Sequence, residues 1–190
     1  MIFCVSNEKY KYIGGYKNPY RNTYTVNDFE SVVKDNIDCA FVFNDDHSRD
    51  VFSAVDVYIR IGTELIGGHK IFCKPDAYEV VLTSIKILSS QVGTVFGYLI
   101  SDLMEFILDK RDVHFSFVDS PFSVQAFLSG LKPELIKEAH YLSTIDVQAA
   151  FDEFSEFDRS FKNILSPESQ VRGSFGFGDL DFTGCFYSYK

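Results

Sequence analysis

The sequence predicts an α/β fold in which helices flank a parallel sheet. Cys39–Phe43 is a continuous apolar run that is too short for a helix, and such a run is typical of a strand with both faces buried. Ile2–Val5 is another short apolar run, and Lys70–Cys73 is expected to be a further short strand. The segments between them carry helix signals, so strand, helix and strand follow one another as in a βαβ unit, whose crossover is right-handed.

A polar, tyrosine-rich stretch, residues 7–25, follows the first predicted strand. It contains the chain breakers Gly14-Gly15 and Asn18-Pro19, together with Tyr10 and Tyr12. Loops of this length are uncommon inside a compact domain and are usually functional. We therefore expect residues 7–25 to form a functional loop.

The next elements are predicted from capping signals. Asn27 with Glu30 forms a capping box that begins a helix through Lys34. After the strand at 39–43 and a polar loop, a second helix is expected at 52–66 and is expected to end at Gly67-Gly68.

The second half of the chain is expected to alternate between helices and strands. Apolar positions at helical spacing predict a long helix over 78–108, and Val113–Val118 is expected to be a strand. Further helices are expected at 133–141 and 144–165. The aromatic tail, residues 173–190, is expected to be extended. There is no internal repeat or low-complexity linker, so we expect one domain over 1–190.

The amino-acid composition limits the classes of partner that the chain is expected to bind. The chain has 190 residues, 46% of them hydrophobic, and a formal net charge of −9. It has no cluster of Lys and Arg, so we expect no binding to nucleic-acid polymers and none to anionic membranes. The uncharged run 87–101 is shorter than the roughly 20 residues that span a bilayer. A free nucleoside or nucleotide remains a possible ligand, because small ligands are held locally.

The four cysteines, none in a Cys-x-x-Cys pair, all lie beside apolar residues. We expect reduced thiols in the core rather than disulfides. The first residues have the character of a strand rather than of a signal peptide. These features predict a cytoplasmic protein, or one of the host cytoplasm if the protein is viral.

The loop after Phe43 is the most charged part of the sequence. In an open parallel sheet, ligands bind outside the carboxyl ends of the strands, so the acids of this loop are candidate site residues. Two interpretations stay open: these side chains contact a ligand or a metal, or they cap the following helix and face water. The residues concerned are Asp45, Asp46, His47 and Asp50.

Several common motifs are absent from the sequence. There is no Gly-x-x-x-x-Gly-Lys phosphate loop, no Gly-x-Ser-x-Gly elbow and no His-x-x-x-His zinc pattern. The glycine run that starts at Gly173 follows no predicted strand–helix boundary, so it is not evidence for dinucleotide binding. We therefore predict no resident metal and no cofactor.

Residues 38–46 and 56–72 resemble the nucleoside 2-deoxyribosyltransferases, in which an apolar strand and an acidic loop precede a helix carrying Glu-hydrophobic-Gly. The tail at 180–187 resembles that family's aromatic C-terminus. The resemblance implies a flavodoxin/Rossmann-like fold and transfer or hydrolysis of the base of a deoxynucleoside through a covalent ribosyl-carboxylate. It also implies a homo-oligomer in which the tail completes the site of a neighbouring subunit.

The sequence departs from this family at the nucleophile. Arg60 stands before Ile61-Gly62 where the family carries its glutamate, and a guanidinium has no lone pair with which to attack. Glu64, expected one helical turn later, can take over that role. Alternatively, Arg60 and Glu64 form only an i, i+4 surface pair. The acids that could protonate the leaving base are Asp45, Asp46 and Asp50.

The first functional hypothesis is therefore an enzyme that transfers or hydrolyses the N-glycosidic bond of a nucleoside or nucleotide. Tyr10 or Tyr12 stacks on the base, Glu64 attacks C1′, and Asp181 and Tyr187 close the pocket.

Two non-catalytic alternatives stay open. In the first, the same scaffold sequesters a nucleotide, with Arg60 pairing with a phosphate. In the second, the chain is an assembly or interaction protein of viral or phage type that docks through the tyrosine-rich loop and the aromatic tail.

Overall fold

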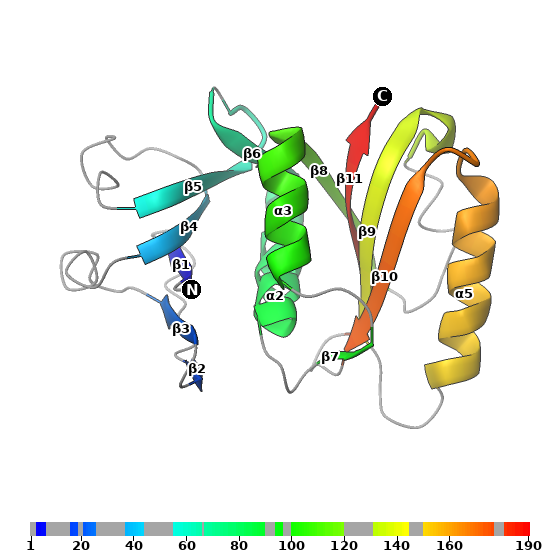
Figure 1. Cartoon of the computed structure of the whole chain (residues 1–190), viewed down its shortest axis with the longest axis horizontal. Coiled ribbons are helices and arrows are strands. Elements are labelled where there is room, and N and C mark those ends of the chain that lie inside the picture. Colours follow the sequence, from blue (N-terminus) through cyan, green and yellow to red (C-terminus); the bar gives the residue numbers. More distant parts are fainter. Residues whose placement is uncertain are drawn as a thin grey trace. The chain divides into compact units, whose positions relative to one another are not determined.

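The computed structural model divides the chain into two compact units, Met1–Pro75 and Asp76–Lys190, and we describe each by itself. Figure 1 identifies the elements along the chain. Strands and helices together form an α/β fold, which confirms the predicted class. None of the helices within the described residues is long and apolar enough to cross a membrane. The residues described are 3–6, 16–18, 21–25, 37–43, 55–65, 67–89, 94–96, 100–119, 131–144, 150–176 and 181–190.

The first unit contains a six-membered run of strands in the order β2-β3-β1-β4-β5-β6. Four neighbouring pairs, from β3 to β6, are parallel, and only β2 runs antiparallel to its neighbour β3. The parallel sheet predicted from the apolar runs is therefore confirmed in this unit. The strands are β1 (Phe3–Ser6), β2 (Tyr16–Asn18), β3 (Arg21–Thr25), β4 (Ile37–Phe43), β5 (Val55–Gly62) and β6 (His69–Phe72).

The centre of this sheet is apolar. Phe41 of β4, Ile59 and Ile61 of β5 and Ile71 of β6 have no solvent-exposed surface. Burial of such side chains is worth about 1.5–3 kcal/mol each. These residues therefore fix the register of β4, β5 and β6.

The helix predicted over 52–66 is wrong for most of its length, because residues 55–62 form strand β5. Val55, Val57, Ile59 and Ile61 alternate with other residues at period two and are all β-branched, which favours a strand. Gly67 and Gly68 lie in the turn between β5 and β6 with φ of 69° and 70°. They therefore do not cap a helix but provide the left-handed backbone that the turn requires.

The second unit has a mixed sheet in the order β8-β11-β9-β10-β7. Strand β11 is antiparallel to both β8 and β9, β10 is parallel to β9, and β7 is antiparallel to β10. The strands are β7 (Thr94–Phe96), β8 (Asp112–Val118), β9 (Ile136–Thr144), β10 (Gln170–Gly176) and β11 (Phe182–Tyr189).

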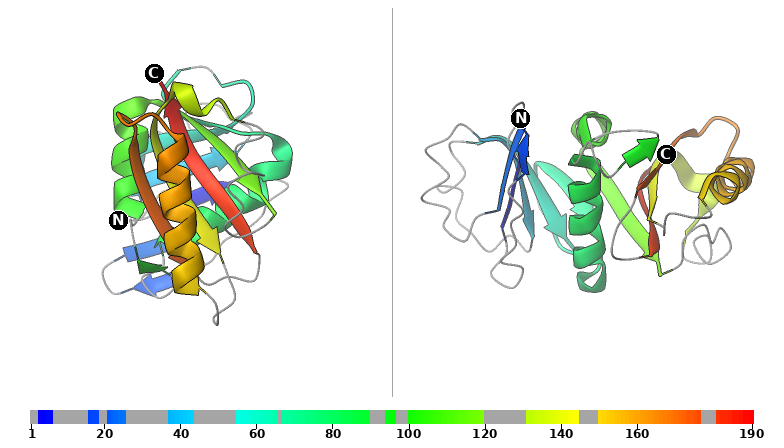
Figure 2. Two further views of the ribbon diagram at one scale, coloured as in Figure 1. Left: turned by 90° about the vertical axis from the view of Figure 1, so that its right-hand side faces the viewer. Right: turned by 90° about the horizontal axis from the view of Figure 1, so that it is seen from below.

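Helices cover both faces of this sheet. Helix α5 packs on one face, while α2 contacts β11 and α3 contacts β8 on the other, so this unit has three layers (Figures 1 and 2). The α-helices are α2 (Tyr78–Ser89), α3 (Ile100–Lys110) and α5 (Ala150–Ile164). Short 3-10 turns are η2 (Pro75–Ala77) and η3 (Pro133–Leu135).

The core under α5 is aromatic. Tyr141 of β9 meets the rings of Phe157 and Phe161 edge-on, at centroid distances of 5.0 and 5.4 Å. These are the edge-to-face arrangements that the ring quadrupoles favour. Cys185 and Tyr187 of β11 complete the same cluster, so the tail forms part of the core of its own unit.

Other sequence predictions for this half have mixed outcomes. The strand predicted at 113–118 is confirmed as β8, and the extended tail is confirmed as β10 and β11. The single helix predicted over 78–108 is wrong, because β7 interrupts it between α2 and α3. The helix predicted at 133–141 is also wrong, because that segment is η3 followed by β9.

The loop predicted over 7–25 is wrong at residues 16–18 and 21–25, which form strands β2 and β3. The helix predicted at 144–165 is confirmed over 150–164 as α5, whereas Thr144 belongs to β9 and residues 145–149 lie outside the described residues. The helix predicted from Asn27 lies outside the described residues. Cys73 and Cys185 are free and buried, as expected for reduced core thiols.

Candidate functional site

The first candidate region is the carboxyl edge of the parallel sheet in the first unit. Strands β1, β4 and β5 are neighbours and run in the same direction. They end at Ser6, Phe43 and Gly62, and the carboxyl ends of neighbouring parallel strands meet at one edge. This edge is where open α/β sheets bind ligands.

Glu64 follows β5 at this edge and is exposed to solvent. Because 55–62 is a strand, Glu64 does not share a helical face with Arg60, and the predicted i, i+4 relationship is wrong. Glu64 instead lies in the turn after the strand, and Arg60 lies within the strand. The two side chains therefore have different surroundings.

Arg60 has a cationic neighbour. It is half-buried in β5, in register with Val42 of β4 on one side and Lys70 of β6 on the other. Residues in register on neighbouring strands project from the same face of a sheet. The structure therefore brings two positive side chains together on one face.

The other predicted ligand contacts of this unit lie outside the described residues: Tyr10, Tyr12, Asp45, Asp46 and Asp50. Their proposed roles remain predictions.

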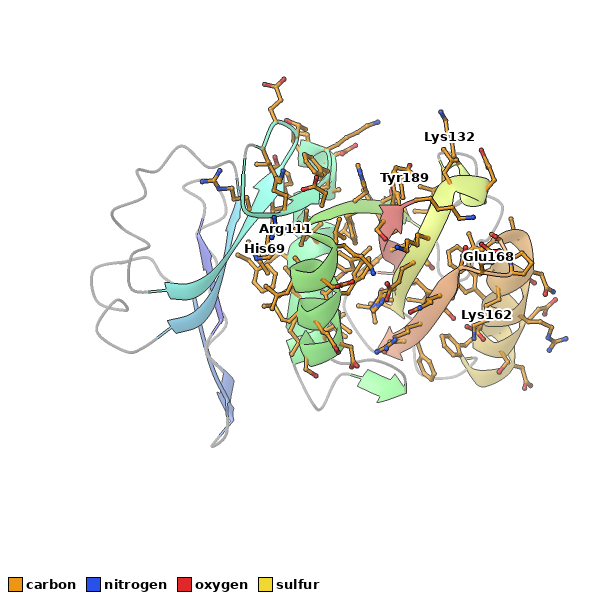
Figure 3. The ribbon with its side chains drawn as sticks, turned by 45° about the horizontal axis from the view of Figure 1, so that its top comes forward. His69, Arg111, Lys132, Lys162, Glu168 and Tyr189 are labelled. Carbon is orange, nitrogen blue, oxygen red and sulfur yellow. The ribbon has the colours of Figure 1, made fainter. Side chains whose placement is uncertain are left out.

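Asp181 and Tyr187 belong to the second unit. Asp181 is exposed immediately before β11, whereas Tyr187 is 5% exposed within β11. The Tyr187 hydroxyl lies 3.2 Å from Ser116 Oγ on β8, and burial raises the pKa of this phenol. Tyr189, at the exposed end of the same strand (Figure 3), contacts the Tyr187 ring edge-on. A role for Asp181 and Tyr187 in a substrate pocket, and oligomerisation through the tail, remain predictions.

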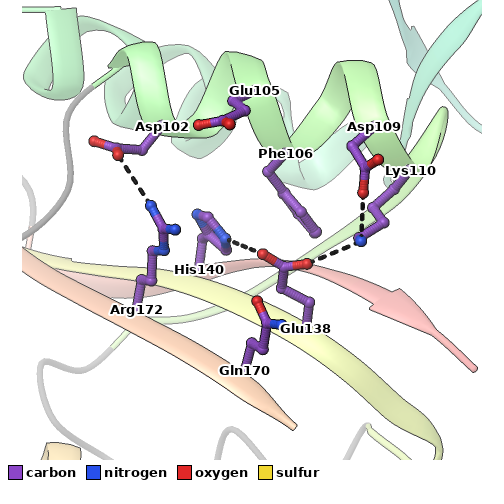
Figure 4. Close-up of a pocket in the computed structure, with 9 residues that line it drawn as sticks. All are labelled: Asp102, Glu105, Phe106, Asp109, Lys110, Glu138, His140, Gln170 and Arg172. Carbon is purple, nitrogen blue, oxygen red and sulfur yellow. Dashed lines mark hydrogen bonds and ion pairs between the residues drawn. The ribbon is translucent and has the colours of Figure 1, made fainter.

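A second candidate site is a polar pocket of about 420 Å³ in the second unit (Figure 4). Helix α3 forms one wall, and strands β9 and β10 form the other. Its volume falls within the range of small-molecule sites. The lining is Asp102, Glu105, Phe106, Asp109, Lys110, Glu138, His140, Gln170 and Arg172.

Glu138 lies between two basic side chains of this pocket. One of its carboxylate oxygens lies 3.0 Å from His140 Nε2, and the other lies 3.1 Å from Lys110 Nζ. Hydrogen bonding to Asp109, and secondarily to Glu138, raises the pKa of Lys110. Lys110 therefore stays protonated and forms an ion pair with Glu138.

His140 is almost completely buried below this pair. Its ring stacks on Phe106 with centroids 4.3 Å apart and planes 11° apart. Burial lowers the pKa of His140, while the hydrogen bond that the ring forms with the Glu138 carboxylate opposes that shift. The imidazole is accordingly neutral at physiological pH.

The opposite end of the pocket is bridged by a second ion pair. Arg172 Nη1 on β10 lies 3.0 Å from Asp102 Oδ1 at the start of α3. Both side chains are partly exposed, so solvent screens this pair and its net contribution to stability is small. The pair nevertheless fixes where the guanidinium lies.

Sequence reasoning missed this pocket. Its residues come from three elements far apart in the chain, and one of them, β9, was expected to be helical. The available signal was the pattern Glu138-x-His140, whose spacing puts both side chains on one face of a strand. Within the described residues, no group of three His, Cys, Asp or Glu side chains is arranged to hold a metal ion.

Comparison with known proteins supports the fold alone. A mutant of FtsZ from M. jannaschii has a similar structure, with a TM-score of 0.56 and 10% sequence identity over 86% of this chain and 68% of that chain. The sequence matches no family model and no curated protein.

Proposed function

We propose that the protein binds a nucleoside or nucleotide at the carboxyl edge of the first unit's parallel sheet and transfers or hydrolyses its N-glycosidic bond. The observation that supports this most is the parallel arrangement of β1, β4 and β5. The tyrosine-rich segment, the acidic segment and Glu64 each follow the end of one of these strands in the sequence. A base-stacking group, an acid and a nucleophile can then act on one ligand.

Glu64 is the proposed nucleophile. Its exposure leaves the carboxylate accessible to a substrate at this edge. Attack on C1′ forms a ribosyl-ester bond and breaks the bond to the base, which leaves with a proton from a nearby acid. Water or a second base then attacks C1′ and releases the carboxylate, giving hydrolysis or transfer.

The neighbouring cations favour a phosphorylated substrate. Arg60 and Lys70 project from the same face of adjacent strands. A guanidinium can pair bidentately with a phosphate, and the second positive side chain adds to the attraction for that anion. We therefore favour a deoxynucleoside monophosphate over the free nucleoside. An acidic chain in which Cys73 and Cys185 are buried and form no disulfide suits action in the cytoplasm.

The test is incubation of the purified chain with deoxynucleosides and their monophosphates, with and without a second base, followed by chromatography for released or exchanged base. Glu64→Gln is expected to lower the rate at least 100-fold, because an amide cannot act as the nucleophile. Glu79→Gln is the matched control, since Glu79 is an exposed glutamate in the first turn of α2. Turnover that survives in Glu64→Gln contradicts the proposed nucleophile.

A non-catalytic nucleotide-sequestering function is the second candidate, and the Arg60–Lys70 neighbourhood favours it as well. In that case a nucleotide raises the melting temperature by mass action while no base is released. The same incubation therefore distinguishes the two functions.

A further inference from the structure

We propose that Phe72 supports the base of the bound nucleotide, so that Phe72, Arg60 and Lys70 together select a ligand with an aromatic base and an anionic group. This role rests on the proposed function, because it assigns the group that recognises the base at the same edge of the first unit's sheet. It depends on the register of β5 and β6, on the partial exposure of the Phe72 ring and on the contact of that ring with Lys70.

Phe72 ends β6 beside the end of β5. It is in register with Gly62, two residues after the pair formed by Arg60 and Lys70. Side chains two residues apart in a strand project from the same face of the sheet, so Phe72 shares a face with both cations. Gly62 has no side chain, so β5 places none beside the ring at this position. The ring therefore lies at the carboxyl edge where open α/β sheets bind ligands.

The Phe72 ring lies at the surface of the unit. Phe72 is only partly buried, whereas Ile71, which projects from the opposite face, has no exposed surface. The ammonium group of Lys70 lies over the ring, with Nζ 5.5 Å from the ring centroid. Because a lysine ammonium is strongly hydrated, its position indicates that this face of the ring is close to water.

An aromatic ring with cations beside it suits a nucleotide. A base stacks on an aromatic side chain through its π face, whichever base it is, while the phosphate pairs with nearby guanidinium and ammonium groups. Cation–π contacts at exposed sites are weak, so a phosphate can draw Lys70 away from the ring and the base can take its place. The 5.5 Å separation lets one small ligand contact both side chains.

The second unit contains a comparable phenylalanine without the cations. Phe117 of β8 is also partly exposed and is in register with a glycine, Gly184 of β11. The neighbouring pair on that face is Phe115 and Phe186, which carry no charge. If the side chain of Phe72 only packs against its own sheet, substitutions of the two phenylalanines are expected to have the same effect on ligand binding.

The experiment compares deoxyadenosine monophosphate with deoxyribose 5-phosphate, which lacks the base. Dissociation constants are measured by isothermal titration of the full chain carrying Glu64→Gln, so that the nucleotide is not consumed. Adding Phe72→Leu is expected to weaken nucleotide binding about tenfold, the value of one base–aromatic contact, and to leave binding of the sugar phosphate unchanged. Phe72→Tyr keeps the ring and is expected to retain the affinity. Phe117→Leu is the matched control and is expected to change neither dissociation constant.

Two outcomes overturn the role of Phe72 alone. The first is nucleotide binding that is as tight in Phe72→Leu as without it. The second is equal weakening for the nucleotide and the sugar phosphate, or equal weakening in Phe117→Leu, which means that the substitution acts on the fold. Thermal unfolding of each variant shows whether it remains folded.

Base release by the chain with Glu64 intact is measured separately. If no base is released while Phe72→Leu weakens only nucleotide binding, the glycosidic chemistry is contradicted and the role of Phe72 is supported. If the nucleotide does not bind at all, both proposals are overturned.

Discussion

The phenol ring of Tyr141 lies against the backbone of Gly173 on the neighbouring strand. The two residues are in register on β9 and β10, and a Cβ atom built at Gly173 would lie 2.1 Å from Tyr141 Cζ. The Tyr141 hydroxyl donates a hydrogen bond of 2.7 Å to Asp158 on α5. The ring thus passes over the glycine to join the sheet to the helix.

Gly173→Ala is therefore expected to lower the free energy of unfolding by about 3 kcal/mol, because the buried ring has no room to move away. Urea denaturation of parent and variant measures the difference. Gly67→Ala is the control: its Cβ would meet nothing within 4 Å, and only its positive φ carries a cost, about 1 kcal/mol. Equal losses in the two variants would contradict the packing argument.

Tyr187→Phe tests whether the tail tyrosine stabilises its own unit. Removing the hydroxyl deletes its 3.2 Å hydrogen bond with Ser116 Oγ, which is expected to cost about 1 kcal/mol. The double variant with Ser116→Ala is expected to lose less than the sum of the single variants, since both remove the same bond. Strict additivity in denaturation experiments would show that the two hydroxyls do not interact.

The strands that sequence patterns predicted correctly are those with one clear signal. Cys39–Phe43 is continuously apolar and lies in β4. Residues 55–62 carried a strand signal too, the alternation of Val55, Val57, Ile59 and Ile61. The glycine pair Gly67-Gly68 is typical of a helix C-terminus as well as of a turn. The sequence therefore also fits a crossover helix that ends there, whereas in the structure those glycines form a turn.

Strand β9 could not be recognised by alternation, because nearly all of it is buried. Its edges pair with β10 and β11. One of its faces contacts α5 through Tyr141, and the other contacts α3 through His140. With its polar residues Glu138 and His140, the segment after Pro133 therefore resembles a helix in the sequence. The polar pocket depends on this strand and on pairing with β10, which only the three-dimensional structure reveals.

Acidification is expected to destabilise the protein through His140. Burial holds its folded-state pKa below the ordinary value of 6.5, so the unfolded chain binds the proton more readily. Above about pH 6.5 the imidazole is neutral in both states and does not favour unfolding. As the pH falls below that value, protonation of His140 in the unfolded chain lowers the free energy of unfolding. The charged groups that face the ring are Glu138, Arg172 and Asp102, and the pair with Glu138 reduces the effect without reversing it.

His140→Gln is expected to flatten the dependence of the unfolding free energy on pH between about pH 7 and 5.5. His114 is the comparison residue: burial also lowers its pKa, so His114→Gln is expected to remove a separate part of the same dependence. Denaturation midpoints at several pH values measure both variants. A steeper dependence in His140→Gln would show that the folded protein favours the protonated imidazole.

Substitution of Arg60 tests whether the proposed ligand carries a phosphate. Arg60→Gln removes the guanidinium next to Lys70 and is expected to reduce the preference for a deoxynucleoside monophosphate over its nucleoside about tenfold or more, the value of one charge-assisted contact. Arg60→Lys keeps the charge but loses the bidentate geometry, so an intermediate preference is expected. Lys74→Gln controls for the change in net charge, because Lys74 is an exposed lysine that follows β6.

Binding is measured by the ligand-induced shift in melting temperature. If Arg60→Gln and Lys74→Gln keep the same preference as the parent, the phosphate is not recognised on this face of the sheet. The ligand is then the free nucleoside.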